Sequence, residues 1–420
     1  MGLRNLFISA AMPVLKLLIV TGVGSYLATK RVGILGGAAR KHLNNVVFYV
    51  FNPCFVYTNL SKTITLKSMV SLWFMPLNIL LTFIIGTVLG WVVIQIIKPP
   101  SRLRGLVLGC CAGGNLGNML IIIVPAICKE KGNPFGAQDL CNKYGLAYAS
   151  LSMAMGAIFL WSYVYNVVRI SASRSDKVGI VNGVMASTNL SEERSKALPG
   201  EPISTQNPTM CEHLEDQREP PSTRTEELNG KPMVPVPVPA QLKQILKTIS
   251  GKVDMKNLLA PSTIGVIIGF FIGMIAPIRK LLIGENAPLR VIQASAALLG
   301  DGAIPTTTII MGGNLTKGIR KSEVRVSLII AIIIVRYIAL PLLGVGVVEG
   351  AIHLGLVHKD PLYQFILLLQ FALPPAMDIG TMTQLFGAGE SECSVILLWT
   401  YSLAILSLTL WSAFFMWLVS

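Results

Sequence analysis

Long stretches without a charged residue alternate with short polar segments along most of this chain. Ser68 to Ile97, Gly105 to Cys128 and Tyr144 to Val168 contain no charged residue. Each stretch reaches the roughly 20 residues that an α-helix needs to cross a bilayer core. Strands of a membrane barrel would alternate apolar and polar residues at a period of two, and these stretches do not. The pattern predicts an all-α polytopic membrane protein.

We predict ten transmembrane helices, five on each side of a hydrophilic segment. The expected spans are 8–29, 43–61, 69–97, 105–128 and 145–168, then 257–278, 290–314, 326–348, 362–388 and 393–419. Residues 1–168 therefore form the first membrane repeat, and residues 257–420 form the second. Residues 169–256 are rich in Ser, Thr, Glu and Pro. Such a composition buries too little apolar surface to fold, so we expect a mostly disordered loop.

Composition and charge agree with this interpretation. Hydrophobic residues make up 52% of the chain and charged residues 13%, with a formal net charge of +14. In a polytopic protein, an excess of Lys and Arg marks the cytosolic loops and does not indicate nucleic-acid binding. Cations gather after span one at Lys30, Arg31, Arg40 and Lys41, and after span seven at Lys317, Arg320, Lys321 and Arg325. We therefore predict that the central loop is cytosolic and that both termini lie on the opposite side of the membrane, although Lys129, Lys131 and Lys143 after span four break the trend.

No pattern typical of an enzyme occurs in the sequence. The seven cysteines form no pair or cluster at metal-binding spacing, and there is no Walker glycine loop or Gly-x-Ser-x-Gly elbow. Five cysteines in apolar segments are expected to be free and to pack as small hydrophobic side chains: Cys54, Cys110, Cys111, Cys128 and Cys393. We predict no cofactor, no metal and no ATP-driven pump, which leaves a carrier, a uniporter or a channel.

The two halves have interruptions at corresponding positions. Asn52-Pro53 in span two corresponds to Ile304-Pro305 in span seven. Gly113 to Asn118, followed by Pro125 in span four, corresponds to Leu373-Pro374-Pro375 in span nine. Two homologous halves of five spans each must be inverted relative to one another. We therefore predict two inverted five-helix repeats in which helices 4 and 9 are broken.

Broken helices release backbone groups that only protein, water or a ligand can satisfy in hydrocarbon. Two breaks that meet near the midplane would present helix N-termini, which favour an anion. The alternative is that these Pro and Gly residues are tolerated kinks and packing surfaces. Candidate substrate-binding residues are Asn52, Gly114, Asn115, Asn118, Pro374 and Gln384, and candidate break residues are Pro53, Pro125, Pro305, Pro374 and Pro375.

Two carboxylates lie inside predicted spans, Asp301 in span seven and Asp378 in span nine. Intramembrane ionisable residues are costly and usually functional. Removal from water favours the neutral form of a carboxyl, so either residue is a candidate for proton coupling. The alternative is a carboxyl bonded to exposed backbone groups, or paired with Arg336 or Lys143. Lys16 and Arg336 are expected to snorkel or to pair.

At these residues the chain resembles the plant PIN-LIKES proteins, relatives of the PIN auxin efflux carriers. The resemblance covers both membrane halves and is especially close through Asn52-Pro53 and from Gly114 to Pro125. It implies ten helices in two inverted repeats, with helices 4 and 9 broken and crossing. It also implies residence in the endoplasmic reticulum membrane and movement of auxin (indole-3-acetic acid) between cytosol and lumen, which lowers nuclear auxin signalling.

The resemblance also assigns a role to Asn118. PIN carriers have an Asn seven residues before the Pro of their fourth helix, where it contacts the substrate carboxylate, and Asn118 stands seven before Pro125. Ala372-Leu373-Pro374 matches the start of their broken ninth helix. Two departures are Tyr57, one place later than in the PIN motif, and Asp378-Ile379-Gly380, where PIN carriers have a second Pro.

The expected partners are therefore a small organic anion, the lipid bilayer and, as one option, a second copy of the chain. Two other function classes stay open. The first is a membrane-anchored receptor or scaffold that uses residues 169–256 to bind a partner. The second is an ion channel whose pore is lined by Asp301 and Asp378.

Overall fold

The computed structural model describes residues 3–65, 69–70, 72–129, 133–173, 260–321 and 324–420. The side chains of residues 3–14, 118 and 317–321 are not described. Most of the predicted loop 169–256 therefore lies outside the described residues. The described part of the chain is helical, and its only extended pairing is an isolated bridge between two helix breaks.

The first half is a series of helices with one clear gap inside a predicted span. Its elements are α1 (Leu3–Leu27), α2 (Gly37–Val46), the π-helical turn η1 (Val47–Phe51), α3 (Asn52–Thr63), α5 (Phe74–Ile97), α6 (Ser101–Ala112), α7 (Asn118–Cys128), α8 (Gln138–Phe159) and η2 (Leu160–Val164). The helix of α8 and η2 continues to Ser173.

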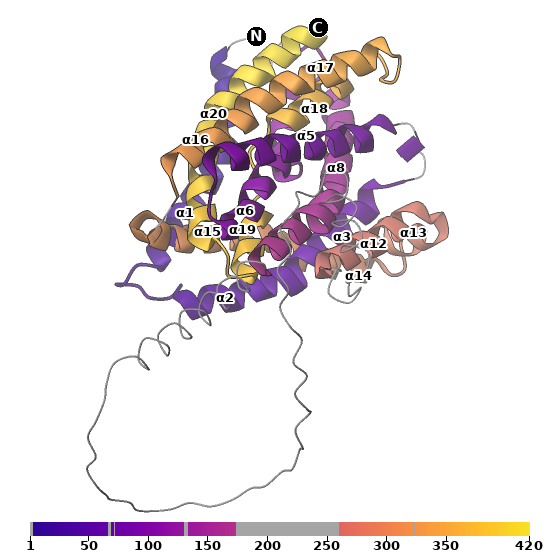
Figure 1. Ribbon diagram of the computed structural model, residues 1–420. Helices are drawn as coiled ribbons and strands as arrows, with labels where there is room; N and C mark the ends of the chain where they lie inside the picture. Colours follow the sequence, from indigo (N-terminus) through magenta and orange to yellow (C-terminus); the bar gives the residue numbers. More distant parts are fainter. Residues whose placement is uncertain (1–2, 66–68, 71, 130–132, 174–259, 322–323) are drawn as a thin grey trace, which may run out of the picture. The chain divides into compact units, whose positions relative to one another are not determined.

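The second half follows the same order. Its elements are α12 (Pro261–Met274), α13 (Ala276–Leu282), α14 (Arg290–Asp301), α15 (Ala303–Lys321), α16 (Val326–Ile334), η3 (Val335–Ala339), α17 (Leu340–His353), α18 (Pro361–Ala372), α19 (Asp378–Leu385) and α20 (Glu390–Val419). The start of α1 and the end of α20 lie on the same side of the described helices (Figure 1).

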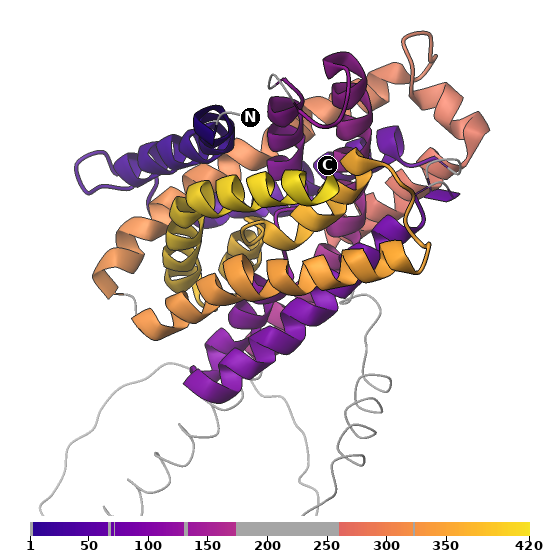
Figure 2. The same ribbon diagram turned by 90° about the horizontal axis from the view of Figure 1, so that it is seen from above.

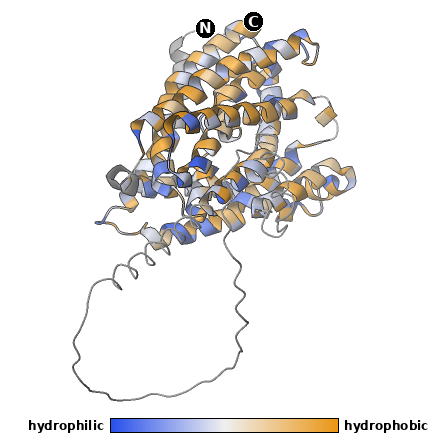
Figure 3. Cartoon of the chain, in the orientation of Figure 1, coloured by the Kyte–Doolittle hydropathy of each residue, from blue (hydrophilic) through white to orange (hydrophobic). Residues whose placement is uncertain are grey.

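Four helical stretches among the described residues are long and apolar enough to cross a membrane: Phe74–Ile97, Gln138–Ser173, Val326–His353 and Glu390–Val419. The pair α12 and α13, bent by 105°, would be a fifth span. Large apolar side chains such as Ile96 and Trp417 are exposed on the outer faces, and apolar residues cover most of the helices (Figure 3). Such surfaces need a lipid environment. The count of ten spans and the inversion of the two halves stay predictions.

Two helix pairs pack closely. α1 lies along α15, and α3 lies along α12 (Figures 1 and 2). The second contact depends on glycines at every fourth position of α12, Gly265, Gly269 and Gly273. A Cβ atom at Gly265 would lie 2.6 Å from the carbonyl oxygen of Pro53. Small residues in this spacing let membrane helices approach backbone to backbone.

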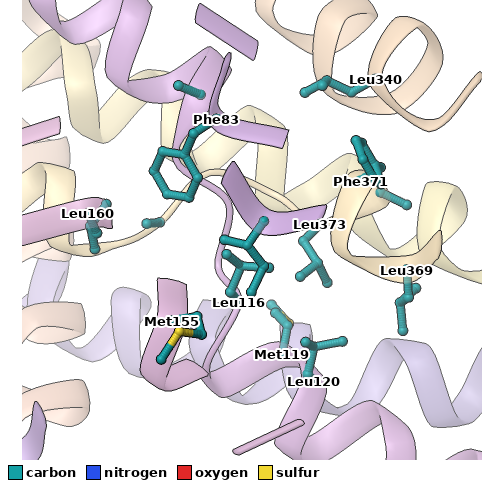
Figure 4. Close-up of a cluster of buried hydrophobic side chains, with 14 of the residues drawn as sticks. Phe83, Leu116, Met119, Leu120, Met155, Leu160, Leu340, Leu369, Phe371 and Leu373 are labelled. Atoms are coloured by element: carbon teal, nitrogen blue, oxygen red, sulfur yellow. The ribbon is translucent and has the colours of Figure 1, made fainter. Parts of the chain in front are cut away.

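The main apolar core surrounds the gaps in the helices. Leu116, Met119 and Leu120 pack there with Leu369 and Leu373, while Phe83, Met155, Leu160, Leu340 and Phe371 close the cluster (Figure 4). A buried polar chain crosses the same core, in which Asn78 Nδ2 donates to Gln370 Oε1 (2.7 Å) and Gln370 Nε2 donates to Ser152 Oγ (2.9 Å). Such bonds hold α5, α18 and α8 together where no water competes.

One prediction about the cysteines is wrong. Cys128, at the end of α7, forms a disulfide with Cys141, near the start of α8, and the two Cα atoms are 5.6 Å apart. α7 and α8 pack against each other and bring the two thiols together, which sequence spacing does not reveal. Cys110, Cys111 and Cys393 are free and buried, as predicted, and Cys54 is free and half-buried.

Candidate functional site

Two gaps in the helices face each other and bond through their backbones. The first separates α6 from α7 at residues 113–117, and the second separates α18 from α19 at residues 373–377. Asn115 N–H donates to the Pro374 carbonyl (2.8 Å), and Ala376 N–H donates to the Gly113 carbonyl (2.9 Å). Each gap therefore supplies partners for groups that the other leaves unpaired. We call this arrangement the crossover.

The local sequence explains why both helices stop here. Pro374 and Pro375 have no backbone N–H, and a residue before Pro avoids the helical conformation. Leu373 accordingly adopts an extended conformation with ψ of 148°. In the first gap, residue 114 must lack a side chain. A Cβ atom on Gly114 would lie 2.6 Å from Nη2 of Arg336 and would clash with it.

Arg336 ties the two gaps together. Its side chain is fully buried and comes from the π-helical turn η3. Nη1 donates to the Cys111 carbonyl at the end of α6, and Nη2 donates to the Pro374 carbonyl, both at 3.1 Å. No carboxylate among the described residues forms an ion pair with it. The guanidinium is therefore a positive charge beside the crossover, held by carbonyl dipoles alone.

Asn115 is part of the framework of the crossover. Its Nδ2 donates to the Tyr401 hydroxyl (2.8 Å), and that hydroxyl donates to the Pro375 carbonyl (2.9 Å). Both residues are almost completely buried. The chain of bonds fixes the first gap to α20 and to the second gap, so Asn115 positions the backbone around it.

Asp378 is the first residue of α19. Its Oδ1 accepts a hydrogen bond from Nδ2 of Asn52 on α3 (3.3 Å). A carboxylate at a helix N-terminus is stabilised by the helix dipole. The structure thus places two predicted site residues in contact and gives Asp378 a partner other than Arg336 or Lys143.

Asn118 is the first residue of α7, directly after Gly117. Its side chain is outside the described part of the structure. The backbone N–H groups in the first turn of a helix have no partner within the helix. They carry the positive end of its dipole. The N-terminus of α7 therefore offers donors to an anion at the crossover.

A cavity of about 50 Å³ lies at this point, and we call it the crossover cavity. Its polar wall includes Asn52, Asn115 and Asp378, together with backbone at Gly114 and Gly117. Its apolar wall includes Phe55 on α3 and Trp161 on η2. Pockets for small ligands usually measure about 300–1,000 Å³, so the cavity is too small for such a ligand in this conformation. A lining that combines polar and aromatic side chains suits an aromatic anion once the cavity widens.

Other predicted residues lie elsewhere. Gln384 is buried in α19, where its Oε1 accepts from Asn314 Nδ2 (3.5 Å), and it lines none of the cavities described here. Asp301 is exposed at the end of α14. The chain stays helical through Pro53 and Pro125, and Pro305 lies in the first turn of α15. A proline in a first turn is tolerated, and a π-helical turn before Pro53 absorbs the missing bond.

Sequence reasoning missed the roles of Arg336, Tyr401 and Trp161. A buried intramembrane arginine was a signal for Arg336, but only the fold shows that carbonyls hold it. Tyr401 and Trp161 lie in apolar helices, where aromatic residues are common, so nothing in the pattern distinguished them.

Comparison with known proteins agrees with this geometry. A family model described as "Membrane transport protein" matches residues 9–412. The chain belongs to this family. It is 51% identical to Protein PIN-LIKES 3 of Arabidopsis thaliana over 420 residues, covering 100% of this chain and 99% of that protein. It is 50% identical to Protein PIN-LIKES 4 over 426 residues, covering 100% of both, and 44% identical to Protein PIN-LIKES 7 over 422 residues, again covering 100% of both.

These matches confirm the resemblance to the PIN-LIKES proteins. They extend over both halves of the chain, so both gaps of the crossover fall inside the family match. The crossover is therefore a feature of a membrane transport protein.

We expect Arg336→Gln to destabilise the fold. The Pro374 carbonyl keeps its bond from the Asn115 N–H, but the Cys111 carbonyl loses the donor that Arg336 supplies, and a buried carbonyl without a donor costs about 1–3 kcal/mol. The measurement is the melting temperature of the detergent-purified protein by fluorescence-detected size exclusion.

Arg279→Gln is the matched control. Arg279 also donates to two carbonyls, those of Ile64 and Lys62 (both 2.8 Å), but at a more exposed helix end where water replaces the lost donor. Equal losses in the two variants would show that the buried position of Arg336 has no special importance.

Proposed function

We propose that this chain carries indole-3-acetic acid across the endoplasmic reticulum membrane, between cytosol and lumen, and so sets the auxin available to the nucleus. The observation that supports this most directly is the crossover cavity. Its lining includes Gly117, the residue before α7, together with the aromatic side chains of Phe55 and Trp161. Indole-3-acetate has the matching parts, a carboxylate and a flat aromatic ring. The relatives of this chain are PIN-LIKES proteins, and the resemblance to that family implies this substrate.

The charges around the cavity favour an anion. Arg336 contributes a buried positive charge with no carboxylate partner among the described residues. Asp378 contributes a negative charge when ionised, but the dipole of α19 and the Asn52 amide already stabilise it. The N-terminus of α7 is free of such a carboxylate, so a substrate carboxylate is best placed there.

A carrier fits better than the two alternatives. A membrane-anchored scaffold needs no pair of bonded helix gaps. A channel with Asp301 and Asp378 along its pore would bring the two residues together, but Asp301 is exposed at the end of α14 and lines none of the cavities described here. A carrier changes conformation around its site, so a cavity of about 50 Å³ that must widen before substrate binds fits this class.

The disulfide supports the proposed orientation. Disulfides persist in oxidising compartments such as the endoplasmic reticulum lumen. Cys128 and Cys141 flank the loop after the fourth predicted span, which faces the lumen if both termini do. The cations around this loop, which broke the charge trend, are therefore lumenal in this proposal, and the central loop is cytosolic.

We expect Asn118→Ala to weaken indole-3-acetate binding about 10- to 150-fold, because a hydrogen bond to a charged group contributes about 1.5–3 kcal/mol. Binding is measured on the purified protein in lipid nanodiscs. Asn166→Ala removes an amide that donates only to the Ser162 carbonyl of its own helix, and should bind normally. Wild-type affinity in Asn118→Ala would contradict the assignment of the carboxylate to this helix end.

Asp378 is proposed to hold the coupled proton. Asp378→Asn keeps an oxygen that accepts from Asn52, so binding should persist. Uptake into proteoliposomes should then lose most of its dependence on pH, because the amide of Asn cannot bind and release a proton as a carboxyl does. Asp301→Asn, at an exposed position, should keep the wild-type profile. An unchanged profile in Asp378→Asn would assign coupling elsewhere.

The orientation predicts the state of two thiols in cells. Protein extracted from microsomes under non-reducing conditions should react with a maleimide polymer at Cys128 and Cys141 only after reduction. Cys128→Ser should release Cys141 and add one modified thiol without reductant, seen as a gel shift. No additional shift would mean that the pair is reduced in the cell and that the loop does not face an oxidising lumen.

A further inference from the structure

A second, larger cavity opens beside the crossover, and we call it the lateral cavity. It measures about 400 Å³ and lies between α1, α3, α7 and α15. Its walls are almost entirely apolar, with Leu17, Val20, Met119 and Ile122 among them. It is therefore large enough for an indole ring in the present conformation, unlike the crossover cavity.

Among the residues whose side chains are described, Lys16 of α1 is the charged residue that lines the lateral cavity. The other polar side chains there are already bonded to their own helices. Asn59 Nδ2 donates to the Phe55 carbonyl (2.7 Å), and Thr308 Oγ1 donates to the Ile304 carbonyl (2.8 Å). Within the described residues, Lys16 forms neither a hydrogen bond nor an ion pair. Lys16 is exposed and the cavity wall is almost entirely apolar, so its aliphatic stem lines the cavity and its ammonium lies at the edge, open to a carboxylate.

The lateral cavity connects with the crossover cavity through shared side chains. A connecting cavity of about 20 Å³ lies between them. It shares Ile304 with the lateral cavity and Asp378 with the crossover cavity, and Phe55 lines all three. Phe55 is half-buried, and it is the described residue common to all three linings.

We propose that the lateral cavity is a first binding site for the aromatic carboxylate. Lys16 binds the carboxylate, the apolar walls bind the ring, and Phe55 separates this site from the crossover. The inference rests on the proposed function, because it takes the same anion as ligand. It adds a site and a route to the crossover that the proposed function does not need.

The test compares a charged and a neutral ligand. In nanodiscs of neutral lipid, Lys16→Met should lower the association rate constant of indole-3-acetate about 10-fold or more, since a nearby opposite charge accelerates capture by such factors. The methyl ester of the same acid should associate at the wild-type rate within about twofold, because it has no charge to attract. Lys16→Arg should restore the anion rate. Stopped-flow fluorescence of the full-length protein measures both ligands.

Two further variants serve as controls. Lys30→Met removes the same charge from an exposed position after α1 and should leave both rates unchanged. Ile122→Trp fills the lateral cavity from a partly exposed position and should slow anion and ester alike. Folding of every variant is checked by its elution and melting profiles.

Two results would overturn the inference. If Lys16→Met captures the anion at the wild-type rate, the ammonium is held by lipid phosphate or water and not by the ligand. If Lys16→Met slows the anion and the ester equally, the lysine supports the cavity wall and does not select charge. Wild-type affinity in both Asn118→Ala and Lys16→Met would instead count against the proposed function. Loss in Asn118→Ala with normal capture in Lys16→Met removes only the lateral site.

Discussion

A backbone group that leaves a helix inside a lipid bilayer must find its partner within the protein, because hydrocarbon offers none. This chain meets that constraint by opening two helices at one place. Gly113 accepts from Ala376, and Pro374 accepts from Asn115, so each gap completes the other. Neither gap would be stable alone. The surrounding helices must therefore hold both in register, and apolar side chains such as Leu116 and Leu373 pack around this contact (Figure 4).

Arg336 donates to a carbonyl beside each gap with a charged side chain. Burying a guanidinium is expensive, and carbonyl dipoles offset that cost only where several converge. The ends of α6 and α18 provide such a place, because their last carbonyls lack partners within the helix. A carboxylate partner would have neutralised the site. No such carboxylate is present among the described residues, so the field beside the cavity is positive. The guanidinium that stabilises the gaps therefore also favours an anion.

The cavities lie where closely packed helices meet this crossover. α3 is fixed against α12 by backbone contacts at Gly265, Gly269 and Gly273. The opposite side of α3 contributes Asn52 and Phe55 to the crossover cavity. The packed contact of α3 with α12 lies on one side of the cavity wall, and the starts of α7 and α19 lie on the other. In our proposal, Phe55 is the movable part of this wall. The large lateral cavity and the small crossover cavity are the two spaces that this ring separates.

Hydrophobic periodicity and proline position determined much of the fold. Uncharged stretches longer than a bilayer crossing can only be helices in lipid. Pro374-Pro375 and the glycines from 113 to 117 cannot continue a helix, so the sequence alone located both gaps. It also indicated Asn52, Asn115 and Asp378 as polar residues near them. The sequence analysis proposed that Asn115 binds the substrate. In the structure, the amide of Asn115 donates to the Tyr401 hydroxyl.

The tertiary structure decided which side chains bond to one another. Arg336 is far from Cys111 in sequence, and Cys128 forms its disulfide across a loop, so no local pattern specifies either contact. Asp301 and Gln384 have the right chemistry, but packing turned one outward and buried the other away from the cavity. Local sequence sets where a helix begins and ends, because those forces act within a few residues. Which groups then meet depends on how whole helices pack, and that is a property of the entire chain.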